Sequence, residues 1–354
     1  MKRRHHFVPR FYLQRFESTP RCINIYNLGR ERVIEGASLR DQCHRHRLYG
    51  SAKVEDAFAD LEGSIAPVLA NIVGTLQAPD ARTQEHHALL AFVALQLLRT
   101  PAHAARALEA TTRMAHVAFA GAPPPGFTGS ERQSLQIALR TFPAMVAALD
   151  DLGMHVVEAP TGHAFMTSDN PVFRYNTYCE GIKWLGVTGA VCRGLQVFLP
   201  LSPRVALMLV DGWVYKMGDS RAAASSTARP QDVESLNLIQ LISAQHNVYF
   251  STRPDDTHLR DLAAPARKLR AARVQRVQVA YQVDDDKSQL LHMHEQMPNI
   301  QLRLSFVRLR RAARRVPLLQ RPSRTRKAVS MLPELPVPPH LRGRTTTFVT
   351  RRPS

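Results

Sequence analysis

Apolar positions recur with a helical period through residues 53–120, where they fall at intervals of three and four. This pattern predicts a series of amphipathic helices, of which the last two meet at Thr100-Pro101 because proline cannot continue a helix. Another helix is predicted for residues 130–151, where Ser130 and Gln133 have the spacing of a capping box. The first half of the chain therefore contains a helical block.

After residue 151 the pattern changes to short apolar runs separated by glycine and proline, which predicts strands. The predicted strands cover residues 154–158, 164–166, 195–199, 205–210 and 247–251. A helix is predicted for residues 231–245, between the last two of these strands. The polar stretch 256–300 contains a predicted strand at 274–283 and a predicted helix at 287–296.

The chain begins with an extended segment that leads into a short helix. Pro9 fixes its own φ and favours extended geometry at Val8, and the aromatic residues that follow it fit a helix ending before Thr19-Pro20. Two β-branched runs at 21–26 and 31–34 then predict a hairpin. Together these elements predict an α+β fold in which the helical block packs with a mostly antiparallel sheet.

The proline-rich stretch 121–126 is the clearest internal boundary. It separates residues 5–120, which hold the N-terminal segment, hairpin and helical block, from an α+β portion at 128–300. The two portions can also form one continuous domain. From about residue 310 clustered arginines and prolines lack apolar periodicity, which predicts a basic, disordered tail at 310–354.

The net charge of +18 is concentrated at the C-terminal end, where residues 301–354 contain 14 Lys and Arg against one acid, Glu334. Such a segment attracts nucleic acid or anionic lipid through counterion release and without sequence specificity. A solubilising extension is the alternative interpretation. Nucleic acid is therefore the partner that composition suggests.

Four cysteines, none of them in a Cys-x-x-Cys pair, do not make a disulfide framework. We therefore expect a reduced, cytoplasmic protein. The longest mainly apolar run, residues 88–98, is too short to span a bilayer, and the basic start lacks the apolar region of a signal peptide. We expect no membrane anchor.

Four motifs in order give the chain a family resemblance. They are the run His5-His6-Phe7-Val8-Pro9-Arg10-Phe11-Tyr12-Leu13, then Leu98-Arg99-Thr100-Pro101, Thr167-Ser168-Asp169-Asn170-Pro171 and Pro200-Leu201-Ser202-Pro203. With these motifs the chain resembles the domain-of-unknown-function 4238 family over roughly residues 5–252. Proteins of this family are mostly bacterial, so the resemblance implies a bacterial protein. It does not imply a particular biochemical mechanism.

His5 and His6 are the first candidate site, because imidazole suits both acid–base catalysis and binding of a divalent metal. The His-His-x-Val-Pro sequence also resembles the start of the ββα-metal nuclease motif, in which one histidine is the base and another binds the metal. The asparagine-bearing strand and helical histidine that complete that motif do not follow here. A structural role for the pair is the competing interpretation.

Asp169 is the second candidate, since its turn motif can place a carboxylate beyond a strand end, either to bind a metal ion or to orient His6. The alternative is that it caps its own backbone. Arg99 can clamp a phosphate with its guanidinium group, or simply end its helix favourably. If a cleft exists, we expect His6, Arg99, Asp169 and Asn237 to converge in it.

Other histidines and cysteines give weaker signals. Cys43 and His46 offer zinc ligands without a second pair to complete the site. His86-His87 and His292-x-His294 lie in helical patterns where neighbours do not share a face, which predicts surface positions.

Two hypotheses follow. In the first the protein is a metal-assisted phosphodiester hydrolase with His5, His6, Asp169 and Arg99 as catalytic residues and His6 and Asp169 as ligands of a divalent metal. In the second it is a non-catalytic binding or regulatory module, in phage defence or a mobile element, whose polar motifs are structural and whose tail holds nucleic acid.

Overall fold

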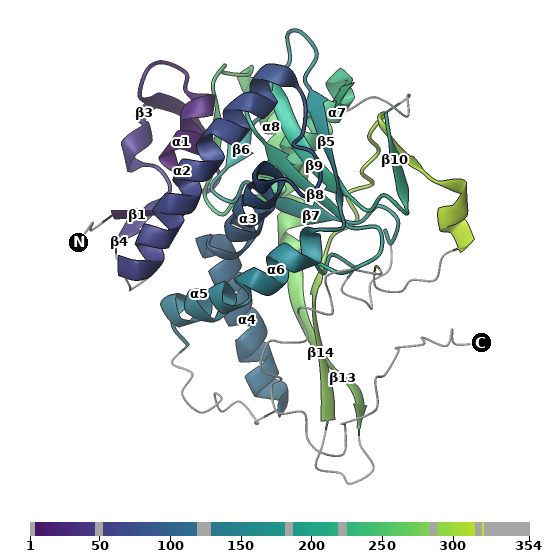
Figure 1. The fold of residues 1–354 in the computed structure, drawn as a ribbon. Coiled ribbons are helices and arrows are strands. Elements are labelled where there is room, and N and C mark those ends of the chain that lie inside the picture. The colour runs from purple at the N-terminus through teal and green to yellow at the C-terminus, as the bar shows by residue number, and fades with distance from the viewer. Residues whose placement is uncertain are drawn as a thin grey trace.

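The computed structural model describes residues 4–46, 52–118, 129–180, 187–218, 225–282, 289–315 and 321 (Figure 1). The α-helices are α1 (Arg10–Leu13), α2 (Ala52–Thr75), α3 (Gln84–Leu98), α4 (Pro101–Ala118), α5 (Glu131–Arg140), α6 (Phe142–Leu149), α7 (Pro230–Ser243) and α8 (Asp256–Ala271). The main strands are β2 (Cys22–Asn27), β3 (Arg32–Ser38), β5 (Gly153–Glu158), β6 (Thr167–Ser168), β7 (Phe173–Tyr175), β8 (Gln196–Pro200), β9 (Val205–Val210), β11 (Ser225–Thr227) and β12 (Asn247–Phe250). Shorter or peripheral elements are β1 (Arg4–His6), η1 (Gln14–Phe16), η2 (Leu39–Asp41), β4 (His44–His46), β10 (Tyr215–Met217), β13 (Val274–Gln282), β14 (Gln289–Gln296), β15 (Val307–Leu309) and η3 (Arg311–Arg315).

A five-stranded sheet in the order β11-β5-β9-β8-β7 forms the centre of the molecule, and only its β11–β5 pair is parallel. Every residue of β8 and β9 is buried. Because side chains alternate along a strand, Leu199 and Leu207 pack with α3 on one face, while Phe198 and Met208 pack with α7 on the other. Helices and mostly antiparallel sheets confirm the predicted α+β fold.

A second sheet joins distant parts of the chain in the order β3-β2-β12-β6. The predicted N-terminal hairpin is confirmed as β2 and β3, and β2 pairs along its other edge with β12, so that Ile25 lies opposite Tyr249. The predicted boundary at 121–126 falls outside the described residues. The sheet runs across it, so the two flanking portions share one core.

The helical block lies against the five-stranded sheet, with α2 and α3 side by side and α4 extending toward the β13–β14 hairpin (Figure 1). The predicted helix at 130–151 is divided into α5 and α6, because Pro143 lies in the first turn of α6 and cannot donate a helical hydrogen bond. No described helix meets the length and hydropathy needed to cross a bilayer by itself, although α3 and residues 101–113 of α4, bent by 57°, do so as a pair.

Several predicted elements between residues 38 and 300 are wrong. Residues 287–296 were predicted as a helix, but 289–296 form strand β14, because pairing with β13 overrides the local helical pattern. Helix α8 is absent from the prediction. Its apolar residues Leu259, Leu262 and Ala266 do recur at helical spacing, but the sequence is polar overall and contains Pro265, which disfavours a helix interior. The predicted strand at 164–166 is not formed, and the short strand β6 follows it at Thr167–Ser168.

Order continues beyond residue 310, where the disordered tail was predicted to start. Residues 311–315 form η3, and Arg321 is only 1% exposed. Its guanidinium donates to both carboxylate oxygens of Asp151 at 3.0 Å and to the Ala190 carbonyl at 2.7 Å. Residues 316–320 and 322–354 lie outside the described part of the chain.

Candidate functional site

The N-terminal histidines lie on strand β1, which pairs with β4 and places His6 opposite His44. The rings of His6 and His44 stack with their centroids 5.8 Å apart. His6 Nε2 lies 3.3 Å from the Arg40 carbonyl oxygen. His6 is half-buried, whereas His5 is only 5% exposed. Burial lowers the pKa of His6, and His44 and Arg10 act in the same direction, so His6 is a neutral imidazole at pH 7.

Arg99 lies at the C-terminal end of α3 with its side chain fully buried. Its Nη1 donates to Glu62 Oε1 at 2.9 Å, and its guanidinium lies 5.8 Å from the centre of the Phe58 ring. In the amide orientation that satisfies its neighbours, Gln96 accepts from Arg99 Nε at 2.9 Å and donates to the Phe7 carbonyl. Arg99 thus joins α2, α3 and the N-terminal segment.

Asp169 lies at the end of β6 and is 4% exposed. Its Oδ1 accepts a hydrogen bond from the Gln245 amide at 2.7 Å, and its Oδ2 accepts from the His246 and Asn247 amides at 2.7 and 3.1 Å. Burial raises the pKa of this carboxyl, and the three amides oppose that effect. The carboxylate therefore holds the turn between α7 and β12.

The family motifs meet in a buried hydrogen-bond network. Tyr12 Oη donates to the Pro200 carbonyl at 2.6 Å and accepts from Thr167 Oγ1 at 2.7 Å. Thr100 donates to Asn170 Oδ1 at 2.7 Å, and the Asn170 amide donates in turn to Ser243 at the end of α7. All four motifs thus contribute to joining the N-terminal helix, α3, β6 and β8.

The four residues expected in one cleft are only partly brought together. Arg99 lies within electrostatic reach of both His6 and Cys43, and Asp169 also acts on Cys43. Asn237 is committed elsewhere, accepting from the Met166 amide at 2.8 Å and donating to the Ala164 carbonyl at 3.0 Å. Arg99 and Asp169 therefore have the buried thiol of Cys43 as a common neighbour.

Cys43 itself is buried, and its Sγ lies 3.2 Å from Tyr249 Oη. Burial raises the pKa of the thiol well above its usual value, which disfavours the thiolate that a metal would bind. In the sequence, Cys43 and His46 offer zinc ligands, but unlinked side chains are the favoured interpretation of their spacing. The side chain of His46 lies outside the described part of the structure.

A group of arginines that carries no sequence motif surrounds Glu295. Arg273 Nε donates to Glu295 Oε1 at 2.6 Å, and Arg106 Nε lies 3.4 Å from the same oxygen. Arg174 and His103 lie within electrostatic reach of these groups. We call these five residues the arginine cluster, and it carries three guanidinium groups against one carboxylate.

The arginine cluster is largely shielded from water. The side chains of Arg273 and Glu295 are 12% and 10% exposed, and that of Arg106 is 24% exposed. Burial alone would raise the pKa of Glu295, but its arginine neighbours outweigh it and hold that pKa at about 2. Burial also lowers the pKa of His103 to about 3, with Arg106 acting in the same direction, so His103 is neutral.

Sequence reasoning missed the arginine cluster because its members come from four separate elements. Arg106 lies on α4, Arg174 on β7, Arg273 precedes β13 and Glu295 lies on β14. Contact between α4 and the β13–β14 hairpin brings them together. Since that hairpin was predicted to contain a helix, no local signal was available to find the cluster.

A family model described as protein of unknown function (DUF4238) matches residues 4–254. This range contains all four motifs of the buried network, whereas Arg273 and Glu295 lie beyond it. No curated protein and no solved structure matches the chain.

Proposed function

Since the chain belongs to the DUF4238 family, whose motifs here form a buried network, we propose that it is a non-catalytic module that binds nucleic acid through its phosphates. The arginine cluster carries this proposal, because three guanidinium groups surround the Glu295 carboxylate in a place largely shielded from water, and Glu109 adds a second negative charge near Arg106 alone. Like charges brought together out of water are unfavourable unless an anion compensates them.

The chemistry of the arginine cluster fits a phosphate group. A guanidinium donates two parallel hydrogen bonds to phosphate oxygens, a geometry that lysine does not provide. Within the described part of the chain, no side chain or carbonyl accepts a hydrogen bond from the Arg174 guanidinium. Arg174 is thus the member most available to a ligand.

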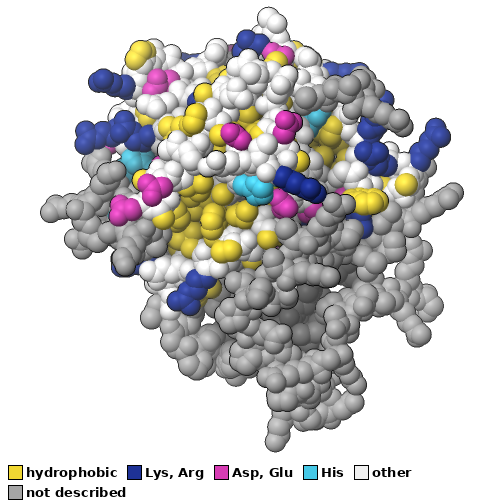
Figure 2. All heavy atoms as spheres, in the orientation of Figure 1, with side chains coloured by type: hydrophobic (Ala, Val, Ile, Leu, Met, Phe, Trp, Pro, Cys, Tyr) yellow, Lys and Arg dark blue, Asp and Glu magenta, His cyan; other side chains and the backbone are white. Residues whose placement is uncertain are grey.

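The C-terminal segment adds charge of the same sign. Residues 322–354 contain seven Lys and Arg against Glu334, and phosphate neutralisation by such a segment is independent of sequence. On the face of the described part drawn in Figure 2, acidic and basic side chains are interspersed around hydrophobic surface. The excess positive charge of residues 322–354 therefore supports phosphate contacts in addition to those proposed for the arginine cluster.

The commitment of Asp169 to three backbone amides supports a non-catalytic role. A carboxylate that binds a metal needs a free oxygen lone pair directed at the ion, whereas the two Asp169 oxygens already face amides in a buried turn. The full burial of Arg99 and its pairing with Glu62 support the same conclusion.

The proposal is tested by the binding of labelled single-stranded and duplex DNA and RNA to the full chain at several salt concentrations. We expect affinity that falls linearly with the logarithm of salt concentration. Arg174→Gln should weaken binding and reduce the salt slope by about one. Arg204→Gln is the matched control, because Arg204 is 75% exposed and pairs with Glu158.

Two outcomes would overturn the proposal. One is the absence of binding to every nucleic acid at low salt. The other is an equal effect of the Arg174 and Arg204 substitutions, which would leave the arginine cluster without a role in binding. Replacing the basic residues of 322–354 by glutamine measures the separate contribution of that segment.

One observation favours phosphodiester hydrolysis as the second candidate function. His6 is half-buried, faces His44 and is held neutral, which suits a general base. Cleavage of the same nucleic acids with Mg²⁺ or Mn²⁺, lost with EDTA and in His6→Ala, would support it. Cleavage that His6→Ala does not change would remove this histidine from consideration.

A further inference from the structure

The N-terminal end of α3 meets the C-terminal end of α6 at a group of three ionisable side chains. His86 and His87 lie in the first turn of α3, after its N-cap Thr83, and Asp150 directly follows α6. Both histidines were predicted to lie on the surface. His87 is exposed, but the prediction is wrong for His86, which is 5% exposed because the packing of α6 against α3 covers it.

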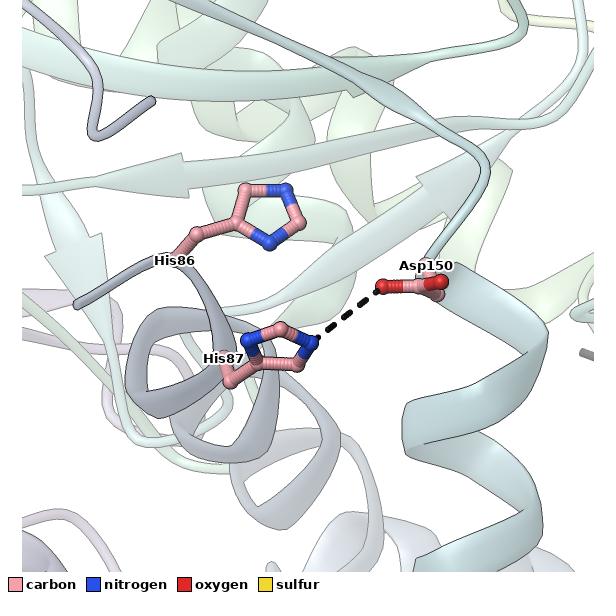
Figure 3. Close-up of side chains that lie close together, drawn as sticks. All are labelled: His86, His87 and Asp150. Atoms are coloured by element: carbon pink, nitrogen blue, oxygen red, sulfur yellow. Dashed lines mark ion pairs between the residues drawn. The ribbon is translucent and has the colours of Figure 1, made fainter. Parts of the chain in front are cut away.

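Figure 3 shows the two imidazole rings and the Asp150 carboxylate directed toward one another. One ligand atom from each residue lies within 4.8 Å of the other two, and His87 Nε2 is 4.0 Å from Asp150 Oδ1. Among the described residues, this is the one group of three His, Cys, Asp or Glu side chains with such spacing.

The backbone fixes the protonation pattern of His87. Its Nδ1 lies 2.7 Å from the Thr83 carbonyl oxygen, which can only accept a hydrogen bond, so Nδ1 carries the proton. In the neutral ring the lone pair is then on Nε2, on the side of Asp150. Histidines that bind metals are commonly oriented by a carbonyl in this way.

His86 supplies an independent indication of a ligand. Its Nδ1 is buried, and within the described part of the chain no group forms a hydrogen bond with it. Leaving a buried polar atom without a hydrogen bond is unfavourable, because the atom has lost its contact with water. A metal ion bound in this group would supply the partner that the buried Nδ1 lacks.

We propose that His86, His87 and Asp150 bind a divalent transition metal ion of the zinc class. Two imidazole nitrogens and one carboxylate are ligands that zinc accepts, and they leave one tetrahedral position for water. Ligand atoms around such an ion lie about 3.4 Å apart, so the 4.0 Å separation must shorten by about 0.6 Å. The Asp150 side chain, 30% exposed, has room for this rotation.

The helix ends do not oppose the ion. A helix N-terminus disfavours a cation, but the C-terminus of α6 directs its negative end toward the same place, and Asp150 adds a full negative charge. Bound metal would link the start of α3 to the end of α6 and stabilise their packing. The site is independent of the proposed binding of nucleic acid, because it shares no residue with the arginine cluster.

The test uses the full chain, purified without a histidine tag and freed of metal with a chelator. Zn²⁺ is titrated by calorimetry, and Co²⁺ is added as a spectroscopic probe of coordination. We expect one Zn²⁺ per chain, a higher melting temperature with Zn²⁺, and a Co²⁺ spectrum without a sulfur charge-transfer band. His87→Ala and Asp150→Asn should each weaken binding by at least about tenfold.

The variants separate this site from others on the chain. His87 and Asp150 are at least partly exposed, so their substitution leaves the fold intact, as circular dichroism will check. His163→Ala is the matched control, because His163 is also exposed and lies outside the group. The proposal is overturned if no Zn²⁺ binds, or if binding survives His87→Ala and Asp150→Asn, or if it is lost only in His44→Ala.

Discussion

Replacing Asp169 by alanine distinguishes a structural carboxylate from a catalytic one. The substitution removes three hydrogen bonds between a carboxylate and the backbone amides of residues 245–247. Each bond to a charged group contributes about 1.5–3 kcal/mol, but the three are not additive, and removing the side chain also abolishes the cost of burying a charge. We therefore expect the free energy of unfolding to fall by about 3–5 kcal/mol, a large part of the stability of an ordinary domain.

Urea unfolding at pH 7, followed by circular dichroism and by tryptophan fluorescence, measures this loss. Asp169→Asn keeps one acceptor oxygen, so its loss should be smaller than that of Asp169→Ala. Asp255→Ala is the control, because exposed Asp255 accepts one amide bond as a helix N-cap and should cost only about 1 kcal/mol. A change below about 1 kcal/mol in Asp169→Ala would refute the structural interpretation of this motif.

Three further substitutions test other parts of the fold. Tyr12→Phe should lower the free energy of unfolding by about 1–3 kcal/mol, because the Pro200 carbonyl loses its buried donor, and an unchanged urea midpoint would contradict this. Gly194→Ala should cost about 2–4 kcal/mol, since Gly194 has φ +78° and a Cβ there would lie 2.7 Å from Tyr178 Cβ; thermal melting will measure it, and a wild-type melting temperature would contradict it. His103 has a folded pKa of about 3, below the unfolded value near 6.5, so the unfolded state binds more protons and stability falls as the pH drops through this window. His103→Gln should therefore flatten the pH dependence of the free energy of unfolding, measured in urea between pH 7 and 5, by up to about 1.4 kcal/mol per pH unit, which is the limit for one proton. Equal slopes in both proteins would contradict the low pKa.

The sequence pattern correctly predicted those elements whose apolar positions face a hydrophobic core in the structure. The N-terminal hairpin, α3, β8 and β9 all lie where the sequence placed them, because their apolar positions face the two cores. Strand β14 and helix α8 were not found. Residues 289–296 form a strand because they pair with β13. Residues 256–271 form a helix that packs against α7, although their sequence is largely polar.

In the candidate site, too, local sequence signals were visible in the sequence, whereas contacts between distant segments were not. The sequence singled out the motif segments, and the structure places Tyr12 against Thr167 and Thr100 against Asn170 in buried hydrogen bonds. Sequence could not show that Asp169 would face three amides, because those amides come from a turn 76–78 residues further along the chain. The arginine cluster and the His86–His87–Asp150 group likewise depend on contacts between separate elements.

The pairing of β2 with β12 has a consequence for synthesis of the chain. Asn27 and Asn247, which bond across this pair, are 220 residues apart, so at 5–20 residues per second the ribosome delivers β12 roughly 10–40 s after β2. During that interval the apolar edge that contains Ile23 and Ile25 has no strand beside it and can pair with other nascent chains. A message truncated before residue 247 would leave this edge open permanently, so such fragments should aggregate or require a chaperone.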